Sequence, residues 1–295
     1  MSQRNDLLVR AGETAHDQWA LDITPQRAGW HFAGIRIVQL AAGASQELRT
    51  GQDKALVLQL GGSCSVNVAG ATYDFARRPE VFTAVTDYLY LPREGTATIT
   101  SARGGGFAVA TGRATRALEV SYRPACYVLV GLRGAGSCSR QVNNYPLGNE
   151  LDTDHLLVCE VPTSGGNWSS CPPHKHDEHS EVERELEEIC YFDIRRGPDG
   201  PGCALHRTCG KPVRPIEICE EVRAGDVVLT HHGFHGPCIA APGYDLNVMA
   251  GPAADGTWLM TDDPAHHWVR GTWDSQDVDP RLPMTRSVNT TQDVQ

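Results

Sequence analysis

The sequence lacks three features that define large classes of protein. It has no apolar run approaching the roughly 20 residues that cross a bilayer, and its ten cysteines form no Cys-x-x-Cys pair. It is also poor in basic residues, with 26 Lys and Arg against 36 Asp and Glu, which gives a net charge of −10. This charge argues against binding to nucleic acid or to an anionic membrane surface, because both need a basic patch. An anionic small substrate is compatible with it only where a local cluster of Arg or Lys outweighs the global sign.

The absence of an apolar stretch in the first 19 residues, MSQRNDLLVRAGETAHDQW, speaks against a secretory signal. We therefore expect a cytoplasmic protein. In a reducing compartment, ten cysteines without paired spacing are best interpreted as small buried apolar side chains rather than as a disulfide framework.

Long helical periodicity is nearly absent as well, and short apolar or alternating runs take its place. Such runs, separated by turn residues, favour β-strands, and many of them in close succession are typical of a sandwich or barrel. The runs are IRIVQL, ALVLQL, CSVNVAG, YLYLP, ATITS, FAVAT, YVLVGL, LLVCEV, EICYFDI, IEICEEV, DVVLT and LNVMAG. The most helix-like segment, 178–188, is polar nearly all round and predicts either a short exposed helix or a loop insertion.

The strand-like runs fall into two series, at about 25–130 and 154–250, which predict two domains. The segment 134–150 lacks a strand pattern and is interpreted as the connection. We accordingly place an N-terminal barrel at 1–145 and a C-terminal barrel with a Trp-rich tail at 146–295.

The two halves share a loose internal similarity, and the tail adds a third feature. Residues 87–100 and 225–241 both read as a strand, a turn with Gly and a second strand. Three Trp in a short tail, at 258, 268 and 273, predict packing onto the body or onto a partner subunit. A homo-oligomer is therefore one expectation.

Histidines are concentrated at two places. His174 and His176 lie in PPHKHDEH, and on a strand the positions i and i+2 point to the same face. His231, His232 and His235 lie in THHGFHG, directly after the apolar run DVVL. Imidazoles so arranged can share one metal ion.

A carboxylate completes the set between the two clusters. LEEICYF supplies Glu187 and Glu188 at the start of a strand, on opposite faces, and the pattern alone does not choose between them. Three His and one carboxylate suit a divalent transition metal with open positions for water or substrate. Lys175, between two candidate ligands, is expected to point away as a solvated charge.

The residues that follow resemble one known family. The string 160–177, EVPTSGGNWSSCPPHKHD, is similar to the signature of the 5-deoxy-glucuronate isomerase family of bacterial inositol catabolism. The resemblance continues through LEEICYF, GDVVLTHHGFHGPCIAAPGYD, LNVMAGP and DDPAHHW, and so covers most of 134–268 in order. The chain departs from the family pattern at the shortened YDLNVMAG, at Cys190 and at His231.

This resemblance implies a fold and a metal site. The fold would be all-β, with two cupin-type β-barrels in one chain (a bicupin). The N-terminal barrel would be degenerate and metal-free, with Thr96 and no His after its Pro-Arg-Glu-Gly turn. The implied metal ligands are His174, His176, Glu188 and His235. The ion would be one divalent metal, with zinc as first choice and manganese or iron as alternatives.

The implied reaction is an aldose–ketose isomerisation in carbohydrate metabolism, from 5-deoxy-glucuronate to 5-dehydro-2-deoxy-gluconate. It needs a polarised carbonyl, a base for the C2 proton and a proton shuttle, and a metal can stabilise the enediol. Glu187, His231 and Tyr191 are candidate bases, with support of the ligands as the alternative role. Arg207, on a predicted strand between the ligand clusters, is a candidate for the carboxylate of this anionic sugar acid, with a surface arginine as the equal alternative.

Two functions from other classes compete with this one. A metal-dependent cupin dioxygenase acting on a small organic acid would use the same ligands, and would show iron and O₂ consumption. A non-enzymatic sugar-acid sensor would need a DNA-binding or signalling module, and the sequence shows neither a helix-turn-helix pattern nor a basic segment.

Overall fold

The chain folds almost entirely into β-strands, as the spacing of the apolar runs predicts. The computed structural model describes residues 7–146, 151–253, 257–287 and 290–291. Each of the twelve runs named above contributes to a strand. The segment 178–188 is a loop followed by the start of a strand, so the loop alternative is correct.

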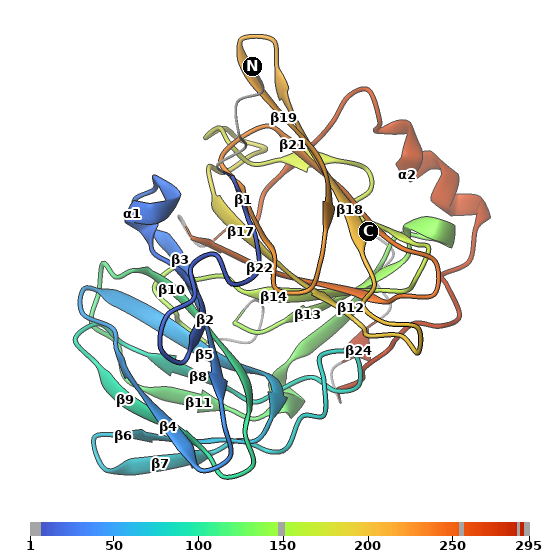
Figure 1. The fold of residues 1–295 in the computed structure, drawn as a ribbon. Helices are drawn as coiled ribbons and strands as arrows, with labels where there is room; N and C mark the ends of the chain where they lie inside the picture. Colours follow the sequence, from blue (N-terminus) through green and yellow to red (C-terminus); the bar gives the residue numbers. More distant parts are fainter. Residues whose placement is uncertain (1–6, 147–150, 254–256, 288–289, 292–295) are drawn as a thin grey trace.

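Two of the four sheets form the N-terminal barrel, in the lower left of Figure 1. The first has the order β11 (Ser121–Arg123), β8 (Tyr88–Leu91), β5 (Asp53–Gly62), β10 (Gly105–Arg113), β3 (Ala33–Leu40) and β2 (Trp19–Ile23). The second has the order β4 (Ala44–Arg49), β9 (Thr96–Ser101), β6 (Ser65–Val68) and β7 (Ala71–Asp74). The space between them is filled by apolar side chains such as Val57, Phe107 and Ile99.

The other two sheets form the C-terminal barrel, the open ring in the upper part of Figure 1. The larger has the order β1 (Leu8–Val9), β20 (Val227–Thr230), β17 (Glu187–Ile194), β22 (Leu246–Ala253), β14 (Cys159–Thr163), β13 (Arg140–Asn144), β12 (Leu129–Arg133) and β24 (Thr290–Thr291). The smaller has the order β19 (Arg214–Val222), β18 (Ala204–Lys211), β21 (Phe234–Ala240), β16 (His174–Lys175) and β23 (Thr261–Asp262), with β15 (Trp168–Ser169) also paired to β21.

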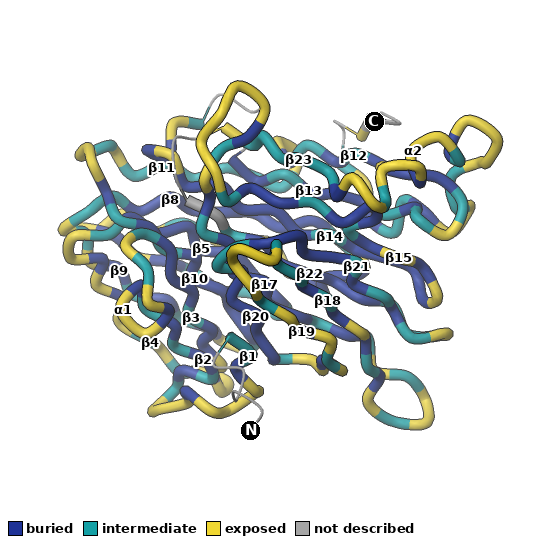
Figure 2. Tube along the Cα trace, turned by 90° about the horizontal axis from the view of Figure 1, so that it is seen from above, coloured by how far each residue is buried: buried dark blue, intermediate teal, exposed yellow. Residues whose placement is uncertain are grey.

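Helices are few among the described residues. The two α-helices are α1 (Pro25–Ala28) and α2 (Trp268–Thr272), and short 3₁₀ turns span Ala125–Tyr127, Gly136–Cys138 and Trp273–Ser275. Figure 2 shows that buried residues follow the central strands, whereas exposed residues lie mainly in the loops.

The larger sheet of the C-terminal barrel is covered on both faces, and β17 shows how its sequence serves both. Cys190 and Phe192 point into the C-terminal barrel. Ile189 and Tyr191 point the other way, into a core shared with β3, β5, β8 and β10 of the N-terminal barrel. The alternation along EEICYFDI therefore places one set of side chains at the barrel interior and the next set at the contact between barrels.

The prediction that 134–150 is only a connection is wrong for its middle part. Residues 140–144, RQVNN, form β13, which pairs with both β12 and β14, and 147–150 lie outside the described residues. The strand escapes an apolar-pattern search because its outward side chains, Gln141 and Asn143, are polar yet buried and hydrogen-bonded to each other at 2.6 Å. Strand pairing thus crosses residue 145, and the domain limits 1–145 and 146–295 stay a prediction.

Asp193 on β17 gives the contact between barrels a pH dependence. Burial, and then the negative charge of Glu160, raise the pKa of its carboxyl to about 7, and its Oδ2 has no hydrogen-bond partner among the described residues. The folded state then holds a proton that the unfolded chain, with a pKa near 3.9, releases. Stability is therefore lost as the pH rises from about 4 to about 7, by up to about 1.4 kcal/mol per pH unit.

Asp193→Asn should remove this loss. Relative to the unchanged protein, we expect the variant to gain free energy of unfolding at pH 8 and to gain little at pH 4.5, measured by urea denaturation at both values. An equal difference at the two pH values would contradict the assignment.

Candidate metal centre

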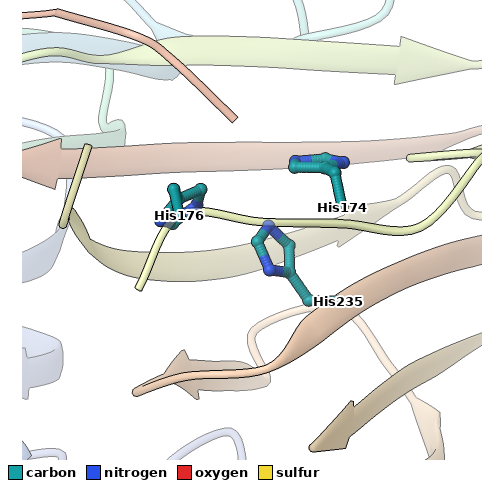
Figure 3. Close-up of side chains that lie close together, drawn as sticks. All are labelled: His174, His176 and His235. Carbon is teal, nitrogen blue, oxygen red and sulfur yellow. The ribbon is translucent and has the colours of Figure 1, made fainter. Parts of the chain in front are cut away.

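Three histidines converge inside the C-terminal barrel. His174 lies on β16 directly opposite His235 on β21 in the strand register, and His176 follows His174 two residues later. One ring nitrogen from each lies within 4.8 Å of the others. Figure 3 shows the three rings close together, with His174 and His176 on one chain segment and His235 reaching toward them from the neighbouring strand. The i, i+2 spacing and the strand–turn–strand of the second cluster together produce this group.

A glycine allows the close approach of the two segments. Gly236 follows His235 with φ +98°, and a Cβ there would lie 2.2 Å from the carbonyl oxygen of Ser170. Only glycine fits at that distance and that φ. The dipeptide His235–Gly236 thus holds β21 against the segment that leads to His174.

Glu188 joins the histidines, which settles the choice that alternation leaves open. Its Oε2 lies 2.6 Å from Nε2 of His176 and 3.3 Å from Nε2 of His235. Burial acts to raise the pKa of this carboxyl, but the charge of His235 and the hydrogen bond from His176 hold it well below its usual range. Cys190, one pleat further along β17, donates from Sγ to Oε1 of Glu188 at 3.2 Å.

The imidazoles are suited to act as ligands. Burial, and then the charge of His235, lower the pKa of His174 well below its ordinary value, so that this ring is neutral. The Nδ1 of His176 lies 3.2 Å from the carbonyl oxygen of Leu186 and can donate to it, which aims Nε2 at Glu188. Burial acts to lower the pKa of His176, but the hydrogen bond and charge of Glu188 raise it, so a cation would take the place of the Nε2 proton. Both ring nitrogens of His235 are buried without a hydrogen-bond partner among the described residues. Orphaned nitrogens beside an ionised carboxylate fit a divalent cation.

Lys175 points away from the histidines, as alternation predicts, but it is not a solvated charge. It is buried, and its Nζ contacts Asp177 at 2.7 Å and Glu183 at 2.7 Å. Glu183 also accepts hydrogen bonds from the backbone N–H groups of Asp177 and Glu178. The loop after His176 is therefore organised around a buried ammonium group, which fixes the backbone of the ligand segment.

His174, His176, His235 and Glu188 form the candidate metal-ligand group. This group opens into a cavity of about 580 Å³ inside the barrel. His174, Glu188 and His235 line it together with apolar side chains such as Val161 and Val248. Trp258, from the tail, also lines it and stands with its ring centroid 6.3 Å from that of His176. This Trp packs onto the barrel as predicted, and Trp273 is buried as well, whereas Trp268 is 62% exposed.

The three candidate bases do not line this cavity. Glu187 accepts hydrogen bonds from the backbone N–H groups of His31, Phe32 and Ala33 at 2.7–2.9 Å, so it links the two barrels. Tyr191 lies in the core between the barrels, where burial raises its pKa well above the ordinary value.

The other two predicted residues also lie elsewhere. His231 packs on Trp30 with ring centroids 4.8 Å apart, and burial is the main cause of its lowered pKa. Arg207 lines a separate surface groove beside Trp168 and Trp268. The structure thus brings the four predicted ligands together, but not the predicted bases or Arg207.

Three cavity residues are absent from the sequence-based prediction. His206 is buried, with Nε2 2.9 Å from Oγ1 of Thr208, and burial lowers its pKa to about 3. Arg133 and Arg140 line the cavity from β12 and β13. No local pattern marks the two arginines, because β13 has no apolar alternation and both β12 and β13 precede the ligand segments in the chain.

The match to a family model decides the affiliation. Residues 7–269 match the model of the KduI/IolB family. The chain belongs to the KduI/IolB family. The 5-deoxy-glucuronate isomerase of Geobacillus thermodenitrificans (strain NG80-2) is 35% identical over 253 residues, covering 84% of this chain and 89% of the relative. The 5-deoxy-glucuronate isomerase of Bacillus subtilis (strain 168) is 29% identical over 254 residues, covering 84% and 91%.

Solved structures agree with this affiliation. A crystal structure of an IolB-like protein from Salmonella typhimurium LT2 has a TM-score of 0.81 and 29% identity, covering 89% of this chain and 98% of that chain. Bacillus subtilis oxalate decarboxylase has a TM-score of 0.61 at 11% identity, covering 89% and 80%, and shares the fold alone. These likenesses confirm the predicted all-β fold with two cupin-type barrels. No helix in the described part of the KduI/IolB chain is long and apolar enough to cross a membrane.

Proposed function

We propose that this KduI/IolB-family chain is a metal-dependent ketol-isomerase that converts 5-deoxy-glucuronate into 5-dehydro-2-deoxy-gluconate. One observation carries the proposal: three histidines and one ionised glutamate meet at the wall of a cavity, in a chain whose relatives bear the name of that isomerase. The cavity, of about 580 Å³, lies within the usual size range of small-molecule sites.

The four candidate ligands would contribute differently to binding of the cation. His174, His176 and His235 would offer neutral nitrogens, and Glu188 would supply the negative charge that offsets the cation. We propose zinc as the ion, with manganese and iron as the alternatives that the same ligands accept. When bound, such an ion supplies a Lewis acid beside the substrate carbonyl and hydroxyl oxygens.

The remaining cavity residues position this set and restrict water. Cys190 and the Leu186 carbonyl orient Glu188 and His176, which keeps the donor atoms aimed at one point. Apolar side chains of β14 and β22 cover the wall beside Glu188. A low-dielectric wall strengthens each electrostatic contact with the substrate.

The test is proton NMR of the reaction in D₂O. Protein loaded with zinc, manganese or iron is incubated with 5-deoxy-glucuronate, and we expect the 5-keto product with deuterium at the new hydroxymethyl carbon. Product without deuterium would keep the isomerase and indicate a hydride shift or a shielded base.

The same samples separate the competing function. O₂ consumption by the iron-loaded protein, without keto-acid product, would replace the isomerase by a dioxygenase. Absence of turnover with all three metals would refute the proposed isomerase activity.

A further inference from the structure

The cavity lined by the metal-ligand group also carries positive charge. Arg133, Arg140 and Arg270 line it together with Glu188. The protein as a whole has a net charge of −10, so its long-range field repels an anion. A cluster of arginines inside the cavity is therefore a local exception that needs an explanation.

Strand register places two of these arginines face to face. Arg133 on β12 lies directly opposite Arg140 on β13. Opposed residues of antiparallel strands project their side chains from the same face, with Cβ atoms about 5 Å apart. Like charges in this position are destabilising. The pair costs stability unless an anion lies between the guanidinium groups.

Arg140 has guanidinium N–H donors that its hydrogen bonds to described residues do not use. Its Nη1 donates to the carbonyl oxygens of Cys138 at 3.1 Å and Cys171 at 3.2 Å, and its guanidinium stands 5.8 Å from the ring centroid of Trp273. Of the five N–H donors of an arginine, these bonds use two. Within the ranges that the structure describes, neither Arg140 nor Arg133 forms an ion pair with a carboxylate.

Arg270 is different, because its charge is already compensated. Its Nε and Nη2 both contact the carboxylate of Asp262. The contrast identifies Arg140 and Arg133 as the two cations of the cavity whose partner is missing from the described protein. An arginine fork without a partner is the donor arrangement that binds a carboxylate through two parallel bonds.

Arg140 also lies close to the metal-ligand group. It holds the backbone carbonyl of Cys171, three residues before His174. Both Arg140 and His174 line the cavity. A small molecule in this cavity can therefore reach His174 and Arg140 together.

We propose that Arg140 and Arg133 bind the carboxylate of the substrate, and so select short sugar acids over neutral sugars. This inference rests on the proposed function, because it places the carbonyl end of a uronate at the metal ligands. It puts Arg140 and Arg133 in the role for which Arg207 was a candidate from the sequence.

The test measures binding without turnover. Isothermal titration calorimetry of the zinc-loaded protein uses 2-deoxy-D-gluconate, which has the carboxylate but no carbonyl to isomerise, and the uncharged 2-deoxy-D-glucitol. We expect Arg140→Gln to weaken binding of the acid at least about tenfold, and Arg133→Gln to weaken it by a smaller, measurable factor. Binding of the glucitol should stay the same in both variants.

A control variant, Arg223→Gln, completes the design. Arg223→Gln, at an exposed arginine paired with Glu221, removes the same charge far from the cavity and should leave both affinities unchanged. Because Arg140 also holds two backbone carbonyls, Arg140→Gln could fail to fold. Arg133 is exposed and forms no ion pair with the described carboxylates, so Arg133→Gln keeps the proposal testable.

Each outcome is decisive, and the failure of this inference differs from that of the isomerase. Equal acid binding by the unchanged protein and both cavity variants would overturn the carboxylate site, as would an unchanged protein with no preference for the acid. Arginine-dependent acid binding without turnover of 5-deoxy-glucuronate would remove the isomerase and retain the site. Normal turnover with the same KM in both variants would retain the isomerase and overturn the carboxylate site.

Discussion

Glu188→Gln is expected to abolish isomerase activity and to release the metal. The carboxylate is the one negatively charged group among the four proposed ligands, and it lies 2.6 Å from His176 and 3.3 Å from His235. Replacing even a residue that supports a ligand lowers metal affinity by roughly 10–100-fold, so loss of a charged ligand should cost at least about 100-fold. Metal content by mass spectrometry and kcat/KM measured with added zinc check both effects.

Glu187→Gln is the matched control. It removes the same charge one residue away, but from the face of β17 that binds the backbone of residues 31–33. We expect this variant to keep its metal and to unfold at a lower temperature. Retention of full metal content by Glu188→Gln, or its loss from Glu187→Gln alone, would show that the ligand assignment is wrong.

Arg78→Met is expected to destabilise the fold by about 3–5 kcal/mol, the usual cost of leaving a buried charge unpaired. Arg78 is 1% exposed and its Nη1 and Nη2 contact the two carboxylate oxygens of Glu160 at 2.8 and 2.6 Å. Because the arginine follows β7 of one barrel and the glutamate lies on β14 of the other, the pair joins the two barrels. Urea denaturation measures the loss.

The double variant Arg78→Met/Glu160→Gln tests the reason for that loss. Removing both charges should restore part of the stability, since the uncompensated carboxylate is then gone while Tyr145 and Asn143 still offer hydrogen bonds to residue 160. Additive losses in the double variant would mean that the two charges do not depend on each other, contrary to this account.

Sequence patterns account for the fold class and for the metal ligands because both depend on local spacing. Alternation over four to eight residues is a property of one strand, and every predicted run became one. His174 and His176 share a face through the pleat alone, and His235 comes one short turn after β20. These relations hold for any pairing of the strands, so they can be read before the strands are paired.

Local spacing could not choose between Glu187 and Glu188, since either face of β17 could have pointed inward. The family resemblance pointed to Glu188, and the physical reason came from the pairing of β17 with β20 and β22 and the packing of its other face on the N-terminal barrel. Because of the same packing, Glu187, Tyr191 and His231 lie outside the cavity, at contacts between the barrels.

The positive side of the cavity is likewise a product of the tertiary structure. Arg133 and Arg140 precede the ligand segments and lie in or beside a stretch that has no strand pattern. They reach the metal-ligand group because β12 and β13 pair onto the far edge of the sheet that contains Glu188. Sequence alone therefore determined which two clusters of histidines can hold a cation, through short-range geometry, and the resemblance named the four candidate ligands. The choice of the inward glutamate and of the arginines depended on long-range strand pairing, which no local pattern contains.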